Sequence, residues 1–268
     1  MTTAVTILGC GSSGGVPRIG NDWGTCDPAN PRNRRRRCSA VITKTGPGGV
    51  TRVLFDTSPD LREQMLSAGI TDIDAVLFTH EHADHTHGID DLRAFFLIKC
   101  QRVQVWADDA TGRMLTTRFA YCFYTAPGSD YPPIIHLNAM QSGKPVTIGG
   151  AGGDITILPF HVHHGTIDAL GFRVGNMAYT PDIDGVPNHS LEALQGLDLW
   201  IVDALRRTRH PSHWSLAQTL DWIERLKPKR AVITNMHIDL DYAELAAELP
   251  GGVVPAYDGL VLTLDAPP

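Results

Sequence analysis

Four side chains of the kind that bind transition metals stand within six positions of this chain: His80, His82, Asp84 and His85. They follow the apolar segment 75–79, which predicts a buried strand. Side chains two positions apart in a strand point the same way, so His80 and His82 can reach one ion. A turn at the strand end would let Asp84 and His85 face a neighbouring ion. A loop that carries histidines by chance rarely holds so complete a set, and the run therefore predicts a metal site.

The hydrophobic pattern predicts short strands and helices along the whole chain. Strands are predicted at 5–8, 40–43, 52–55, 75–79, 103–106, 146–148, 155–159, 171–174, 177–180, 199–202 and 231–234. Helices are predicted at 60–68, 92–99, 111–120, 191–194 and 216–226. This succession indicates an α/β fold in which two sheets face each other and helices lie outside.

Composition limits the classes of function. The chain has 268 residues, 43% of them hydrophobic, which fits one layered domain with a full core. A net charge of −6 argues against a protein whose whole surface binds nucleic acid. The N-terminal segment lacks the pattern of a secretory signal, and no apolar stretch is long enough to span a membrane. Five scattered cysteines without a CxxC pair indicate reduced thiols in the cytoplasm.

Two further segments could contact phosphate groups. The glycine-rich segment 9–15 contains Ser12 and Ser13 and follows the first predicted strand. Such loops can hold phosphate with backbone N–H groups, although a tight turn is the simpler interpretation here. Five of the six residues 32–37 are arginines, and we expect Arg34, Arg35 and Arg37 to bind substrate. Arginine forks suit phosphate oxygens, although such a run is usually a solvated loop.

The run at 80–85 resembles the signature of the metallo-β-lactamase-fold hydrolases, and further parts of their pattern follow in order along the chain. Asp56 resembles the strand-end aspartate that orients a ligand histidine in that family, His164 the third histidine of the first metal, and Asp182 the carboxylate shared by both metals. The resemblance implies an α/β fold of the four-layer βα/αβ sandwich type. It also implies a single domain over 1–268, with the metals at one edge.

Within that superfamily the chain most resembles the phosphoribosyl cyclic phosphodiesterases of the carbon–phosphorus lyase pathway, and in outline the ribonuclease Z-type enzymes. The resemblance lies in Leu8-Gly9-x-Gly11, Arg37-Cys38-Ser39 and Tyr257-Asp258-Gly259. One departure is that the early loop of this chain holds only Cys26, so we expect no structural zinc there.

The second departure concerns the last metal ligand. In the family a histidine directly follows a strand-end threonine, whereas here Thr234 is followed by Asn235, and the nearest histidine is His237. Either His237 takes the ligand role or Asn235 binds through its carbonyl oxygen. We expect His237, because imidazole is the stronger ligand for these ions.

These residues together predict a phosphodiesterase with two divalent ions per chain, most simply zinc or manganese. The resemblance assigns His80, His82 and His164 to one ion and Asp84 and His85 to the other, with Asp182 shared, and we expect His237 to complete the second set. Two ions about 4 Å apart can bridge and activate a hydroxide. The expected catalytic residues are Asp84 and His213, the latter resembling a histidine that the related phosphodiesterases keep beside the metals and able to protonate the leaving oxygen.

The expected substrate is a small phosphodiester, such as a cyclic sugar phosphate or a nucleotide. A thioester or lactone hydrolase on the same fold is an alternative that needs no anion-binding loop. A tRNA 3′-processing endonuclease would need a protruding basic arm, and a non-catalytic metal- or nucleotide-binding module would not need the full ligand set. We expect no membrane and no stable nucleic-acid partner. Pairing of sheet edges into a homodimer is open.

Overall fold

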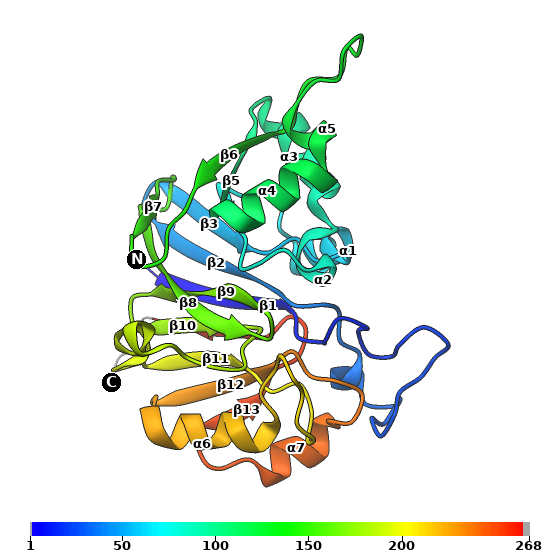
Figure 1. The fold of residues 1–268 in the computed structure, drawn as a ribbon, viewed down its shortest axis with the longest axis vertical. Coiled ribbons are helices and arrows are strands. Elements are labelled where there is room, and N and C mark those ends of the chain that lie inside the picture. The colour runs from blue at the N-terminus through cyan, green and yellow to red at the C-terminus, as the bar shows by residue number, and fades with distance from the viewer. Residues whose placement is uncertain (1, 265–268) are drawn as a thin grey trace.

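The computed structural model describes residues 2–264, and in it two seven-stranded sheets face each other with helices on both outer sides (Figure 1). The first sheet has the order β14-β1-β2-β3-β4-β5-β6. Its strands are β14 (Val261–Thr263), β1 (Thr2–Gly9), β2 (Ser39–Gly46), β3 (Gly49–Phe55), β4 (Ala75–Leu77), β5 (Val103–Ala107) and β6 (Ile135–Ala139). The second sheet has the order β13-β12-β11-β10-β9-β8-β7. Its strands are β13 (Val253–Pro255), β12 (Arg230–Thr234), β11 (Leu199–Asp203), β10 (Met177–Thr180), β9 (Ile167–Val174), β8 (Ile155–His164) and β7 (Val146–Ile148).

The helices divide between the two outer faces, as Figure 1 shows. Those on the first sheet are α1 (Leu61–Ala68), α2 (Ala83–Thr86), α3 (Arg93–Lys99), α4 (Asp109–Arg118) and α5 (Ala120–Phe123). Those on the second sheet are α6 (Leu216–Leu226) and α7 (Tyr242–Glu248). The predicted four-layer βα/αβ sandwich is therefore confirmed.

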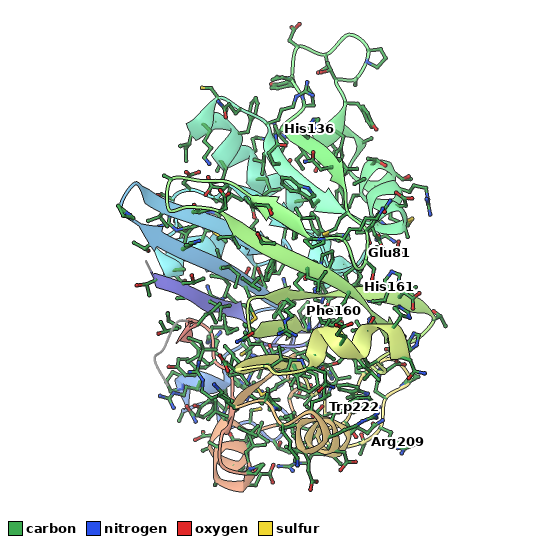
Figure 2. The ribbon with its side chains drawn as sticks, turned by 90° about the vertical axis from the view of Figure 1, so that its left-hand side faces the viewer. Glu81, His136, Phe160, His161, Arg209 and Trp222 are labelled. Atoms are coloured by element: carbon green, nitrogen blue, oxygen red, sulfur yellow. The ribbon has the colours of Figure 1, made fainter. Side chains whose placement is uncertain are left out.

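The main core lies between the sheets, because strands alternate their side chains between two faces. On β2, Ala40 and Ile42 face the second sheet, whereas Val41 faces the helices. Phe55 of the first sheet stacks on Tyr179 of the second, with ring centroids 5.6 Å apart. On β8, Phe160 is only 2% exposed, whereas its neighbour His161 is half-buried; both are labelled in Figure 2.

The sequence predictions missed several peripheral elements. Strand β9 begins at Ile167 rather than at 171, and β6, β13, β14 and α7 were not predicted. The segment 191–194 belongs to a 3-10 helix, Asn188–Leu194, rather than to an α-helix. The missed strands β13 and β14 have only three residues each, too few to show a period.

Parallel pairing brings several strand ends to one edge of the sandwich. Strands β3 and β4 run parallel in the first sheet, and β10, β11 and β12 run parallel in the second. Their carboxyl ends therefore meet at the same edge, which is where ligands bind in open α/β sheets. Strand β11 ends at a polar side chain, Asp203, and each of the other four strands is followed within three residues by one: Asp56, His80, Asp182 or Asn235.

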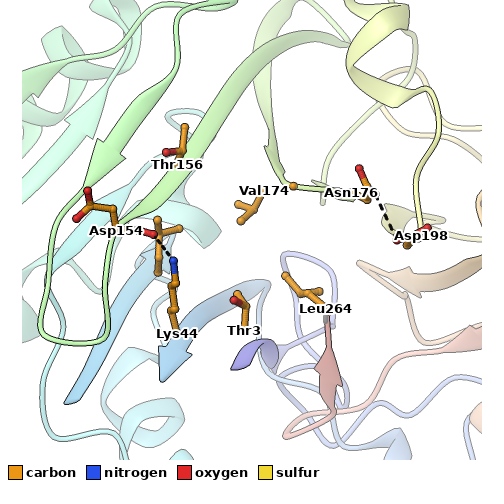
Figure 3. Close-up of a pocket in the computed structure, with 10 residues that line it drawn as sticks. Thr3, Lys44, Asp154, Thr156, Val174, Asn176, Asp198 and Leu264 are labelled. Carbon is orange, nitrogen blue, oxygen red and sulfur yellow. Dashed lines mark hydrogen bonds between the residues drawn. The ribbon is translucent and has the colours of Figure 1, made fainter. Parts of the chain in front are cut away.

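A cleft of about 480 Å³ lies at the opposite end of the sandwich (Figure 3). Thr3 and Lys44, which pair across β1 and β2 far from the Gly9 end, line it. Lys44 Nζ donates to the carbonyl oxygen of Asp154 at 2.8 Å, and Asn176 Nδ2 donates to Asp198 Oδ2 at 3.4 Å. None of the predicted site residues lines this cleft. Among residues 2–264, no helix is both long and apolar enough to cross a membrane.

Candidate metal centre

Three histidines and one aspartate form a first group of candidate ligands. They come from both sheets: His80 and His82 follow β4, His164 ends β8 and Asp182 follows β10. One ligand atom from each of the four lies within 4.8 Å of the others. His82 Nδ1 and His164 Nε2 face each other at 3.0 Å, and the nitrogens of His80 and His164 lie 3.7 and 3.5 Å from Asp182 Oδ2. The structure thus brings together the set expected for one ion.

A second group shares Asp182 with the first. It consists of Asp84, His85 and Asp182, again with ligand atoms within 4.8 Å of one another. His85 Nε2 lies 3.1 Å from Asp182 Oδ1 and 3.5 Å from Asp84 Oδ2. Asp182 therefore turns one carboxylate oxygen to each group.

The protonation states and the unpaired atoms of these residues fit a divalent cation. Among residues 2–264, His80 Nε2 and His85 Nε2 are buried without a hydrogen-bond partner, a costly arrangement unless a ligand satisfies them. Burial and the imidazole of His85 hold the pKa of His80 well below its usual range, so His80 is neutral with a free lone pair. Burial alone would raise the pKa of Asp182, but His85 and the other imidazoles outweigh it and hold that pKa well below its usual range. A His/Asp cluster of this kind suits divalent metal binding.

Asp56 orients His85 through a hydrogen bond to its ring. Its Oδ2 accepts hydrogen bonds from His85 Nδ1 and Thr79 Oγ1, both at 2.8 Å, and its Oδ1 accepts from Thr79 N at 2.7 Å. A proton on Nδ1 leaves Nε2 of His85 free to face a metal. Asp56 has φ 61°, a left-handed conformation that aspartate tolerates better than most residues.

His164 is held by a close approach of two loops. Its Nδ1 donates to the carbonyl oxygen of Ser212 at 2.6 Å. The next residue, Gly165, has φ 66°, and a Cβ there would lie 2.7 Å from Ser212 Cβ. This explains the His-Gly pair, which requires glycine for both conformation and space. His163 instead is exposed and faces Asp168.

His213 lies beside the first group without belonging to either group of candidate ligands. Its Nδ1 donates to Asp203 Oδ2 at 2.7 Å, and its Nε2 lies 3.8 Å from Asp182 Oδ2. Burial lowers the pKa of His213, but the carboxylate of Asp203 outweighs burial and raises that pKa to about 9. Burial also raises the pKa of Asp203, to about 7. His213 thus holds a proton next to the candidate metal groups.

The structure does not bring His237 to either group. Its Nε2 accepts a hydrogen bond from the guanidinium of Arg18, and its Nδ1 donates to Asp239 Oδ1 at 3.0 Å. Asn235 lies at the site instead, with Nδ2 3.3 Å from Asp182 Oδ1 and 3.2 Å from Asp203 Oδ1. Both ring nitrogens of His237 are engaged elsewhere, so the expected ligand role does not fit its position.

The glycine-rich and arginine-rich segments pack against each other. A Cβ at Gly9 would lie 2.0 Å from the carbonyl oxygen of Arg37, so glycine allows the two backbones to touch. Arg35 is buried, and its guanidinium donates to the carbonyl oxygens of Leu240 at 2.7 Å and His237 at 3.3 Å. The expected contact of Arg35 with substrate does not fit this position, because the side chain holds two loops together. Cys26 Sγ lies in the same place, 3.4 Å from the carbonyl oxygen of Ile238.

The other expected substrate contacts lie nearer the surface. Arg37 pairs with Asp60 at 2.8 Å, and Arg34 is exposed with its guanidinium 5.4 Å from the ring of Trp23. Both line a cleft of about 600 Å³. Ser13 is exposed, whereas Ser12 is buried beside Met236, and its hydroxyl has no hydrogen-bond partner in the described part of the chain.

Three polar residues of this edge were not predicted from the sequence. Asp203 ends the apolar strand β11 just as Asp56 follows β3, and this parallel is the signal that could have revealed it. Thr79 stands between a strand and the first histidine, where a threonine is an ordinary strand residue. Arg18 is isolated in a loop, and only the fold brings it to His237.

Comparison with known proteins agrees with this geometry. Residues 51–238 match the family described as "Beta-lactamase superfamily domain". The crystal structure of a new diphosphatase from the PhnP family superposes with a TM-score of 0.87 and is 36% identical, with 98% of this chain and 97% of that chain covered. Human tRNase Z, short form, superposes with a TM-score of 0.63 over 98% of this chain and 100% of that chain, at 18% identity, which shows a shared fold alone.

A curated relative carries a different name. An octanoyltransferase from Porphyromonas gingivalis is 33% identical over 265 residues, which are 97% of this chain and 51% of the relative. The chain thus spans about half the length of that protein, and the name describes the whole of it. The family match, the PhnP-family relative and the His/Asp cluster agree on a metal-dependent hydrolase. The chain belongs to the beta-lactamase superfamily.

Proposed function

We propose that this protein is a dinuclear phosphodiesterase that hydrolyses a small phosphodiester, such as a cyclic sugar phosphate or a nucleotide. The observation that carries the proposal is the position of Asp182, which turns Oδ2 to one group of candidate ligands and Oδ1 to the other. A shared carboxylate of this kind would help to hold two cations, and pairs of cations serve phosphoryl transfer.

The ligand residues would bind the two ions and set the distance between them. His80, His82, His164 and Asp182 would hold one ion, and Asp84, His85 and Asp182 the other. Zinc or manganese suits these ligands best. When bound, two such ions would polarise a phosphoryl oxygen and lower the pKa of a bound water to about 7.

His213 would protonate the leaving oxygen. Its Nε2 faces the cluster, while Asp203 holds Nδ1 and stabilises the charged ring. Because an alkoxide leaves poorly, a proton delivered from Nε2 accelerates the cleavage of an alkyl or cyclic ester more than that of an aryl ester.

We propose Arg18 as a cation for a further anionic group of the substrate. Within residues 2–264 the structure gives it no carboxylate partner, whereas Arg36 and Arg37 pair with Asp258 and Asp60. Its guanidinium donates a hydrogen bond to His237 Nε2 and, without an acidic partner among these residues, is available to an anion.

A diphosphate linkage is the second candidate substrate. It is favoured by the 36% identity to a PhnP-family diphosphatase over nearly the whole length of both chains. Its bridging oxygen leaves as a phosphate, which needs less help from an acid than an alkoxide does. The two candidates therefore differ in how much they should depend on His213.

A substrate panel distinguishes these functions. Protein reconstituted with manganese or zinc is offered a cyclic ribose phosphate, a dinucleoside diphosphate, a thioester and a lactone, and product formation is measured for each. We expect turnover of the phosphodiester, or of the diphosphate if the second candidate is correct, and loss of that turnover in Asp182→Ala. Robust thioester or lactone turnover without any P–O cleavage would refute the proposal. With five free cysteines in the described residues, we propose the reducing cytoplasm as its location.

A further inference from the structure

The two groups of candidate ligands are unequal. The first offers three imidazoles and a carboxylate, whereas the second offers one imidazole and two carboxylates, one of which is shared. Asn235 lies where a further ligand of the second group could stand, because its side chain reaches the same oxygen, Asp182 Oδ1, that faces His85.

The side chain of Asn235 presents a donor to the cluster, not an acceptor. Its Nδ2 lies 3.3 Å from Asp182 Oδ1 and 3.2 Å from Asp203 Oδ1, and carboxylate oxygens accept hydrogen bonds. An amide NH₂ group carries no lone pair for a cation. Its hydrogen bond also occupies part of the acceptor capacity of Asp182 Oδ1, the shared ligand atom of the second group.

The amide cannot easily turn to offer its oxygen instead. Asn235 is only 1% exposed, so its side chain has no room to swing toward solvent. A flipped amide would place Oδ1 against the oxygens of Asp182 and Asp203, where two acceptors would repel each other. The backbone has φ 59°, which Asn accommodates and which sets the direction of the side chain.

No neighbouring residue takes the place of the missing ligand. His237 has both ring nitrogens engaged, with Arg18 and Asp239. His213 is bound through Nδ1 to Asp203 and lies nearer the first group, with its ring 4.6 Å from that of His164. Within residues 2–264 the second group therefore keeps three ligand residues.

We infer that the two metal sites have unequal affinities because of Asn235: the site of His80, His82 and His164 binds its ion tightly, and the site of Asp84 and His85 binds its ion weakly. An anionic phosphate oxygen would supply the ligand that Asn235 does not, so the second ion binds more tightly when a phosphate is present. This inference rests on the proposed function only in that both groups hold ions.

Calorimetric addition of Mn²⁺ to the metal-free protein tests this inference. We expect two binding steps whose affinities differ by about 10- to 100-fold or more, since even the loss of a group that merely orients a ligand costs that much. Inorganic phosphate should strengthen the weak step and leave the tight one unchanged. Two equal steps, or no effect of phosphate, would overturn the inference.

Substitutions locate the cause. Asn235→His adds a ligand nitrogen, tolerates the left-handed backbone and should strengthen the weak step by about 10-fold or more, an effect of the order expected for ligand groups. Asn235→Ala removes the amide and should leave the weak step weak, and His237→Ala, the matched control two residues away, should change neither step. A weak step abolished in either alanine variant would show that the substituted residue binds metal, contrary to the inference. Unequal steps in a protein without P–O hydrolase activity would refute the proposed function alone.

Discussion

Two aspartates at strand ends, one in each sheet, each accept a hydrogen bond from Nδ1 of a different histidine. Asp56 follows β3 and binds His85 Nδ1 at 2.8 Å, and Asp203 ends β11 and binds His213 Nδ1 at 2.7 Å. Both aspartates are fully buried. In both pairs the carboxylate holds the proton on Nδ1 and turns Nε2 toward the cluster.

The difference lies in what surrounds the two imidazoles. His85 is completely buried, and its Nε2 faces Asp182 and Asp84, whereas the side chain of His213 is 13% exposed and its Nε2 lies no closer than 3.8 Å to a carboxylate of the cluster. We therefore propose that the same carboxylate–imidazole pair serves as a metal ligand where carboxylate oxygens converge on Nε2, and as a proton donor where one side of the ring stays open.

The largest loss of activity is expected from a substitution of Asp182, whose carboxylate lies near the rings of both His85 and His213. Asp182→Ala removes an oxygen from both groups, so it should release at least one ion and reduce hydrolysis by about 10³-fold or more, corresponding to several kcal/mol of lost stabilisation. Metal content by mass spectrometry and kcat measure this. A fully loaded and active variant would contradict the shared-carboxylate arrangement.

His213→Ala tests the second carboxylate–imidazole pair, in which the ring is partly exposed. Its loss should reduce hydrolysis of an alkyl or cyclic phosphodiester by about 10²-fold, because the leaving oxygen is no longer protonated. A nitrophenyl ester leaves without a proton and should lose little, at unchanged metal content. Equal losses on both substrates would indicate that His213 binds phosphate instead of donating a proton.

Asp56→Asn and Asp203→Asn compare the two carboxylates directly. Asp56→Asn should weaken metal binding by about 10- to 100-fold, because His85 loses the partner that orients it. Asp203→Asn should leave the two metal affinities nearly unchanged, because His213 belongs to neither ligand group. Calorimetry with Mn²⁺ measures both variants, and equal losses of affinity would remove the distinction between the pairs.

The pH dependence should give the smallest effect. His213 must carry its proton to act as an acid, so kcat for an alkyl phosphodiester should fall by about tenfold per pH unit as the pH rises through its pKa. That pKa is raised to about 9 by Asp203 against the effect of burial, and bound cations would lower it. In Asp203→Asn the fall should begin at lower pH. A profile identical to that of the wild type would show that Asp203 does not stabilise the charged ring.

The parts of the site that lie close together in the sequence could be predicted, and those that depend on distant contacts could not. His80, His82, Asp84 and His85 lie within six positions after β4, His80 and His82 in the loop and Asp84 and His85 in the short helix α2, so local geometry alone brings them to one edge. The choice between Asn235 and His237 depends on the left-handed backbone at 235 and on Arg18, more than 200 positions away. Neither leaves a signal in the local pattern.

In the arginine-rich segment, too, the contacts of the side chains could not be predicted from the sequence. Charge alone predicts that Arg35 and Arg37 contact substrate, but charge does not show which partners the fold supplies. Arg35 donates hydrogen bonds to the carbonyl oxygens of residues 237 and 240, and Arg37 forms an ion pair with Asp60. The sandwich itself was predictable, because the hydrophobic runs of β2, β3, β11 and β12 are long enough to show their periods.

The segment that matches the family is shorter than the segment needed for folding, because β1 lies outside the match and inside the first sheet. The family match spans residues 51–238, yet β1 lies between β14 and β2 inside the first sheet, and β13 pairs with β12 in the second. Arg36, before that span, is tied to Asp258, after it, at 2.9 Å. A truncated protein cut at the family boundaries would expose β3 and β12 as bare, aggregation-prone edges, so expression of the module alone should fail although it contains every ligand of both groups.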